Sequence, residues 1–194
     1  MARTTASVVT PERYAQGLTW EQWMQAIEKN QARFRENYDE TELPPEDVEA
    51  IRALVARPDG PAKCLALGED WCPDVFRGLP VMAKLAQATG MELRIFFRDR
   101  NKDIMAEFLN RGEFESIPVF VFYTRNLEYI AHWIERPQKA NDEMHLLRSI
   151  FEGRSREEAR EDYIAFQHGP VWAGWRLETV REIRALLEAH YTGT

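Results

Sequence analysis

The chain has 194 residues, of which 44% are hydrophobic and 29% are charged, and its formal net charge is −7. This composition is typical of a soluble globular protein, and the acidic charge argues against general binding to nucleic acid or to an anionic membrane surface. No apolar run approaches the roughly 20 residues of a membrane span, and the first residues are too polar for a secretory signal. We therefore expect a cytoplasmic protein that binds neither nucleic acid nor membranes.

Residues 1–61 predict an N-terminal helical extension. Thr19 and Gln22 have the spacing of a capping box. Apolar residues then recur at three-, four- or seven-residue intervals as far as Tyr38, which predicts one helix with an apolar face. Two prolines after Leu43 would end it, and a second short helix is expected over residues 48–55. This helical pair would pack on the core or on a partner, and a homodimer is one possibility.

Residues 62–151 predict a core of alternating strands and helices. Apolar runs at 63–68 and 93–97 are expected to be strands, with a helix between them that ends at Gly90. A further helix is expected at 104–109. The last two strands are separated by a short turn, so they should form an antiparallel hairpin; they span residues 118–123 and 128–134. The order is β-α-β-α-β-β-α, an α/β core with a mixed sheet.

Residues 152–194 predict a C-terminal helical extension within a single domain of residues 1–194. A charged stretch from residue 152 is expected to be helical through Phe166, and Gly169-Pro170 to interrupt it. The last helix is expected from about Leu177 to Ala189. Trp172 and Trp175 precede it; they could mark a binding surface, but more often such residues close a helix over the core.

The segment Trp71-Cys72-Pro73-Asp74-Val75 is the strongest functional signal. It directly follows the expected strand 63–68 and begins a helical segment that carries Pro80, eight residues after Cys72. Ser116-Ile117-Pro118 precedes the third expected strand. Together, in this order, these features resemble the thioredoxin family over roughly residues 62–151.

The resemblance implies a thioredoxin-like fold and an attacking cysteine, Cys72, at the N-terminus of a helix. It implies that Trp71 flanks the sulfur, that Pro118 is cis, and that the backbone of Ile117 pairs with an extended substrate. No bound cofactor is implied, although glutathione or another thiol could be a co-substrate. The implied partner is a protein or a low-molecular-weight thiol or disulfide.

The sequence departs from the thioredoxin pattern at three places. Val75 stands where the family has the second cysteine, which releases a mixed disulfide. Ala66 stands where thioredoxins bury a carboxylate that assists the second thiol. Glu135-Arg136-Pro137 follows the last strand where the family commonly has a glycine, which suggests a different or more restricted partner groove.

Local electrostatics at Cys72 predict a modestly acidic thiol. The free N–H groups and the dipole of a helix N-terminus favour a thiolate, and Pro73 suits the first helical position because it has no N–H to leave unbonded. The carboxylate of Asp74 opposes this effect because it repels a thiolate. Cys64 lies too far back along its strand to bridge Cys72 and is expected in the core.

Three roles for Cys72 remain open at this stage. The first is thiol–disulfide exchange by a single cysteine, with an external thiol that resolves the intermediate. The second is a redox-inactive thioredoxin-fold module that binds a partner. The third is peroxide sensing through a sulfenate at Cys72. A zinc site is disfavoured because the four histidines have no metal-ligand spacing to one another or to the cysteines.

Overall fold

The computed structural model describes residues 7–193 and centres on a four-stranded sheet in the order β2-β1-β3-β4. β1 pairs with β2 in parallel and with β3 antiparallel, and β3 and β4 form the antiparallel hairpin that the sequence predicts. Residues 64–68 of β1 are all buried, and because consecutive side chains point to opposite faces, both faces of the strand are covered, which explains its uninterrupted apolar run. The strands are β1 (Lys63–Gly68), β2 (Glu92–Phe97), β3 (Val119–Tyr123) and β4 (Tyr129–Ile134).

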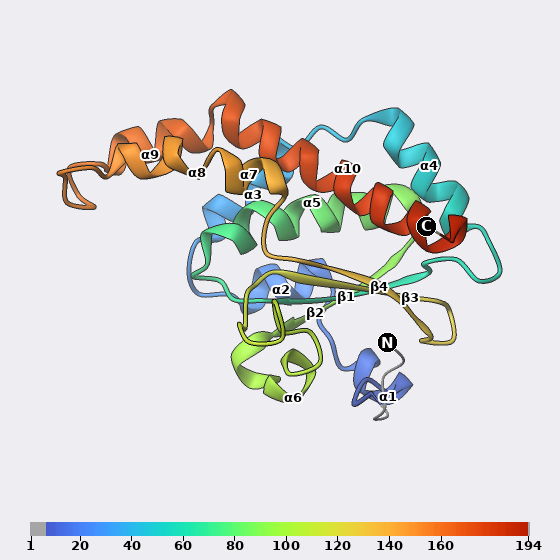
Figure 1. Cartoon of the computed structure of the whole chain (residues 1–194). Helices are drawn as coiled ribbons and strands as arrows, with labels where there is room; N and C mark the ends of the chain where they lie inside the picture. Colours follow the sequence, from blue (N-terminus) through green and yellow to red (C-terminus); the bar gives the residue numbers. More distant parts are fainter. Residues whose placement is uncertain (1–6, 194) are drawn as a thin grey trace.

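Helix α5 (Pro73–Thr89) lies between the sheet and a second helical layer that contains α10 (Figure 1). Pro73 occupies its first turn, and Gly90 ends it in the left-handed conformation, with φ of 79°. Pro80 lies inside this helix and is buried. The site residues that the sequence places around Cys72 therefore begin a helix held on two sides by the core.

The N-terminal part forms four helices: α1 (Pro11–Ala15), α2 (Trp20–Ala26), α3 (Gln31–Asp39) and α4 (Pro45–Val55). The capping box of Thr19 and Gln22 is present at the start of α2. The expectation of a single helix as far as Tyr38 is wrong, because the chain breaks between α2 and α3, where Asn30 has φ of 56°. The predicted second helix is confirmed as α4.

The break between α2 and α3 is fixed by the loop that precedes Trp71. The carboxylate of Asp70 accepts hydrogen bonds from the backbone N–H groups of Glu28 and Lys29, each at 2.9 Å. The side-chain amide of Asn30 donates to the backbone carbonyl of Asp70, also at 2.9 Å. The N-terminal helices are therefore bonded directly to the Cys72 loop.

After β2 the chain forms the 3₁₀ turn η1 (Arg98–Arg100) and the short helix α6 (Lys102–Met105), which ends before the expected helix 104–109 is complete. The chain beyond β4 forms α7 (Gln138–Asp142), α8 (Met144–Ile150), α9 (Arg160–Gln167) and α10 (Pro170–Thr192). Helical structure in the charged stretch from residue 152 begins only at Arg160. No helix within residues 7–193 combines the length and apolar character needed to cross a membrane.

Helix α10 begins seven residues before the expected start at Leu177. Gly169-Pro170 starts this helix because proline is favoured at the first helical position. Trp172 and Trp175 are consequently part of α10, and their side chains are buried at 1% and 0% exposure. Both side chains therefore pack α10 onto the core, and the sequence pattern favours this role over a binding surface.

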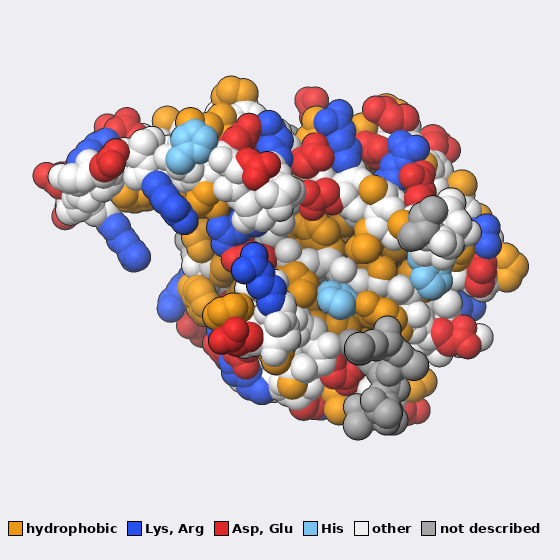
Figure 2. Space-filling model, viewed as in Figure 1, with side chains coloured by type: hydrophobic (Ala, Val, Ile, Leu, Met, Phe, Trp, Pro, Cys, Tyr) orange, Lys and Arg blue, Asp and Glu red, His pale blue; other side chains and the backbone are white. Residues whose placement is uncertain are grey.

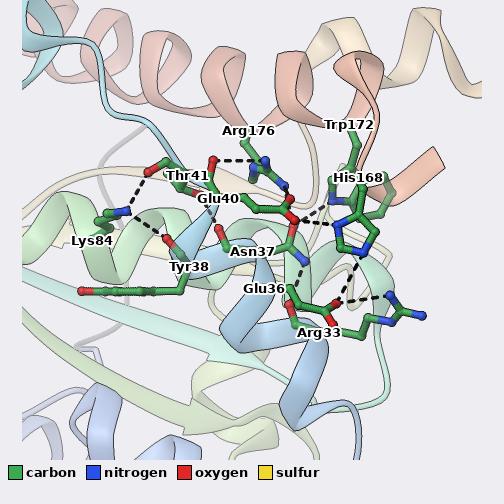
Figure 3. A network of polar contacts seen from close by, with 10 residues as sticks. All are labelled: Arg33, Glu36, Asn37, Tyr38, Glu40, Thr41, Lys84, His168, Trp172 and Arg176. Carbon is green, nitrogen blue, oxygen red and sulfur yellow. Dashed lines mark hydrogen bonds and ion pairs between the residues drawn. The ribbon is translucent and has the colours of Figure 1, made fainter. Parts of the chain in front are cut away.

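A polar network joins the N-terminal and C-terminal helices above α5 (Figure 3). The buried Asn37 of α3 accepts hydrogen bonds through Oδ1 from Nε1 of Trp172, at 2.8 Å, and from Nη1 of Arg176, at 3.0 Å. Lys84 of α5 donates to two backbone carbonyls at and beyond the end of α3. The network thus joins α3 to α10 beside α5.

Candidate functional site: a thiol at a helix N-terminus

The structure brings Cys72 and the Ile117–Pro118 segment together, as the family resemblance implies. Cys72 is the N-cap residue of α5, and its Sγ lies 3.8 Å from the carbonyl oxygen of Ile117. The Ile117–Pro118 peptide bond is cis. Gly78 allows this approach, because a Cβ on Gly78 would lie only 3.3 Å from Cγ of Pro118.

Trp71 is a surface residue of the site. Its side chain is 46% exposed, and the guanidinium of Arg98 lies 5.4 Å from the centroid of its ring. Pro73 is also exposed. The loop that carries Cys72 therefore offers an aromatic and apolar edge to an incoming molecule.

The structure contains no second thiol beside Cys72 within residues 7–193. Val75 and Ala66, two of the three departures from the family pattern, are both fully buried. Cys64 is free and fully buried in β1, where the sequence analysis expected it, and burial raises the pKa of its thiol far above the ordinary value. Cys72 is also free and partly buried.

The expectation of a modestly acidic Cys72 is wrong. Burial of the thiol, and then the negative charge of Asp74, raise the pKa of Cys72 above its ordinary value. The backbone N–H groups of Val75 and Asp74 and the charge of Arg77 lower the pKa, but they do not overcome burial. The predicted effect of Asp74 on the Cys72 pKa has the right sign, but the depth at which the sulfur is buried cannot be read from local sequence.

Asp74 is held by two arginines: Arg77, which was not assigned to the site from the sequence, and Arg136, which lies in the 135–137 segment predicted to alter the partner groove. Its Oδ1 lies 2.8 Å from Nη2 of Arg77, whose side chain is 1% exposed, and its Oδ2 lies 2.7 Å from Nη2 of Arg136. Arg136 also pairs with Glu135. The sequence does contain a signal for the Asp74–Arg77 ion pair, because Arg77 follows Asp74 by one helical turn.

A groove of about 850 Å³ opens beside this cluster. We call it the arginine groove, because five arginines line it: Arg77, Arg136, Arg154, Arg156 and Arg160. Four aromatic residues also line it: Trp71, Phe151, Tyr163 and Trp172. One side is the Cys72 loop and the start of α5, and the other is an arm formed by α8, α9 and the segment between them. Figure 2 shows basic side chains on the underside of this arm and around the hollow below it.

No group of three or more histidine, cysteine, aspartate or glutamate side chains within residues 7–193 is arranged to hold a metal ion. The chemistry that the described site offers is therefore that of one thiol, a cluster of charges and an aromatic edge.

Comparison with known proteins places this geometry in context. A family model described as thioredoxin matches residues 17–152. No curated protein matches the chain. Two crystal structures are similar to it: a protein of unknown function from Pseudomonas aeruginosa and an HIV epitope-scaffold. Each is 20% identical with a TM-score of 0.63, and the match covers 95% of this chain and 99% of the other. At this identity the likeness supports the fold alone.

Proposed function

Because the chain belongs to the thioredoxin family, we propose that Cys72 is a single exchange thiol whose mixed disulfides are resolved by an external thiol. The observation that carries the proposal is the 3.8 Å approach of Cys72 Sγ to the carbonyl oxygen of Ile117, next to the cis-proline. The exposed ring of Trp71 supports it, because it supplies a contact surface for a substrate.

The proposed reaction has two exchange steps. The thiolate of Cys72 attacks one sulfur of a disulfide, a new S–S bond forms, and the second sulfur leaves as a thiolate that takes up a proton from water. Val75 provides no thiol for the next step. A thiolate from solution, such as glutathione, therefore attacks the mixed disulfide, becomes disulfide-bonded to the substrate sulfur, and releases Cys72.

The raised pKa of Cys72 limits the rate of this chemistry at neutral pH. Only the thiolate attacks, so the rate should rise with pH until the thiol is fully ionised. A Cys72 that reacts slowly at neutral pH and faster at alkaline pH is the expected profile.

The test is formation of a mixed disulfide with glutathione disulfide, followed by mass spectrometry after proteolysis. We expect glutathione on Cys72 in the wild-type protein, none in C72S, and an unchanged Cys72 adduct in C64S, because Cys64 is fully buried. Absence of an adduct on wild-type Cys72 even at alkaline pH would contradict the proposal. So would an equal loss of exchange in folded C64S and C72S.

The second candidate is a thioredoxin-fold module that binds a partner without redox chemistry. It is favoured by the raised pKa of Cys72 and by the ion pairs that hold Asp74 close to the thiol. The mixed-disulfide assay separates the candidates: a Cys72 that forms no mixed disulfide at alkaline pH, although iodoacetamide still alkylates it there, supports the binding role.

A further inference from the structure

The arginine groove is positively charged although the chain as a whole is acidic. Five arginines line it, and Asp74 is the one carboxylate among its lining residues within the described chain. The formal net charge of the protein is −7. We propose that this groove binds an acidic, extended peptide segment of a partner protein.

The positive charge of the groove is only partly neutralised by the protein itself. Arg77 and Arg136 share the carboxylate of Asp74, and the buried Nε of Arg77 makes no hydrogen bond. Arg136 also pairs with Glu135, and Arg154 pairs with Asp162. On the arm, the exposed side chains of Arg156 and Arg160 make no hydrogen bond or ion pair with another residue in 7–193. An excess of cationic donors therefore faces the groove, and carboxylates would satisfy them.

The apolar part of the groove favours a peptide over a simple anion. Trp71 is 46% exposed, and the rings of Phe151 and Tyr163 lie 5.3 Å apart between centroids. Tryptophan, tyrosine and arginine are the residues that contribute most to protein–protein binding sites. A phosphate or a citrate ion would use the arginines but would make no apolar contact with these rings. A segment that alternates acidic and apolar side chains would use both.

The position of the groove relates the bound segment to the thiol. Trp71, Pro73 and Asp74 line the groove and also flank Cys72 in sequence. An occupant of the groove therefore lies against the loop that carries the sulfur. The proposal itself needs no reaction at Cys72, so peptide binding and thiol exchange can succeed or fail separately.

The probe is a fluorescein-labelled peptide of alternating glutamate and phenylalanine residues, and binding is measured by fluorescence anisotropy at low ionic strength. A matched peptide with glutamine in place of glutamate reports the contribution of charge. We expect the wild-type protein to bind the acidic peptide, and added salt to weaken binding because exposed charges are screened. C72S should bind it as the wild type does.

The decisive variant is R156E/R160E, which reverses two charges on the arm. Both side chains are exposed, and glutamate at residue 160 suits the N-terminus of α9, so the fold should be kept; circular dichroism checks this. R125E/R181E is the matched control, because it makes the same change of charge at two exposed residues outside the groove. We expect about a tenfold or greater loss of affinity in R156E/R160E and little change in the control.

The proposal would be overturned by no binding of the acidic peptide, equal binding of the glutamine peptide, equal losses in R156E/R160E and R125E/R181E, or displacement of the peptide by an equal concentration of citrate. The last outcome would identify a site for small anions. Tighter binding of oligothymidylate than of the acidic peptide would also overturn it, in favour of a nucleic-acid site.

Discussion

The side chain of Val75 packs directly on the backbone of Gly68, so that a Cβ built on Gly68 would lie 2.8 Å from Cγ1 of Val75. Val75 is the third residue of α5, three positions after Cys72, and Gly68 is the last residue of β1. The position that would hold a second thiol is therefore closely packed against the central strand. A cysteine side chain is smaller than valine and fits there without displacing β1.

V75C should convert Cys72 into half of a dithiol pair. The new thiol can resolve the mixed disulfide within the same molecule, so reduction of insulin disulfides by V75C should exceed that of the wild type several-fold. The assay is insulin turbidity with dithiothreitol as reductant. V75A is the control, because it also shortens the side chain but adds no thiol. Equal rates for V75C and wild type, with both folded, would mean that the site does not accept protein disulfides.

D74N should make Cys72 more reactive and the protein less stable. Neutralising Asp74 removes a charge that raises the pKa of Cys72 and leaves the cationic Arg77 and Arg136 nearby, so the pKa should fall and alkylation at neutral pH should speed up several-fold. Arg77 would lose its charged partner while buried, which should cost about 3 kcal/mol of unfolding free energy. The measurements are the pH profile of iodoacetamide alkylation and urea unfolding.

E135Q is the matched control for D74N. Glu135 pairs with the same Arg136, yet its charge is not among the causes of the raised Cys72 pKa. Its alkylation profile should therefore stay close to that of the wild type. If E135Q accelerated alkylation as much as D74N, the faster alkylation would be caused by the release of Arg136 from a carboxylate, and not by the loss of the Asp74 charge.

Glu69 should make stability depend on pH. Burial raises the pKa of this carboxyl above its ordinary value of 4.5, and its carboxylate accepts a hydrogen bond from the backbone N–H of Asp99. The folded state thus holds the Glu69 proton more tightly than the unfolded state does. The contribution of Glu69 to the free energy of unfolding therefore falls as pH rises through and above 4.5. Relative to wild type, E69Q should gain stability as pH increases across that window.

Urea unfolding of the two proteins at a series of pH values measures this difference. E113Q, at an exposed glutamate, is the control and should follow the wild type. A constant difference between E69Q and the wild type at all pH values would exclude a linked proton at Glu69.

N37A should loosen the joint between α3 and α10. The change leaves the buried Nε1 of Trp172 and one nitrogen of Arg176 without their shared acceptor. The expected loss is about 1–3 kcal/mol of unfolding free energy, measured by urea denaturation. N126A, in the exposed turn between β3 and β4, should change stability little. Equal effects of the two substitutions would show that the network does not stabilise the fold.

Local patterns in the sequence predicted the core well. Contiguous apolar runs indicated the strands, and Gly90 indicated the end of α5, because burial and left-handed backbone conformations leave local signals. The meeting of Cys72 and Pro118 came from the family resemblance. The interruption predicted at Gly169-Pro170 is wrong, because the same dipeptide is compatible with a helix interruption and with the helix start that the structure has there.

The features that the sequence did not predict depend on contacts between distant segments. The break before Asn30 is fixed by Asp70, which no periodicity reveals. The arginine groove needs the arm to fold back beside α5, so Arg156 and Arg160 looked like part of a charged surface stretch. The pKa of Cys72 depends on burial, which is a property of the assembled site.

The hydrogen bonds from Glu28 and Lys29 to Asp70 affect how this protein can be shortened. A fragment of residues 62–151 keeps all four strands and α5, yet its Asp70 carboxylate loses both backbone donors. The adjoining Trp71-Cys72 loop is then released on one side. An excised core is therefore a poor substitute for the full chain in any assay of this thiol, and transplanting the site into another scaffold requires the α2–α3 turn as well.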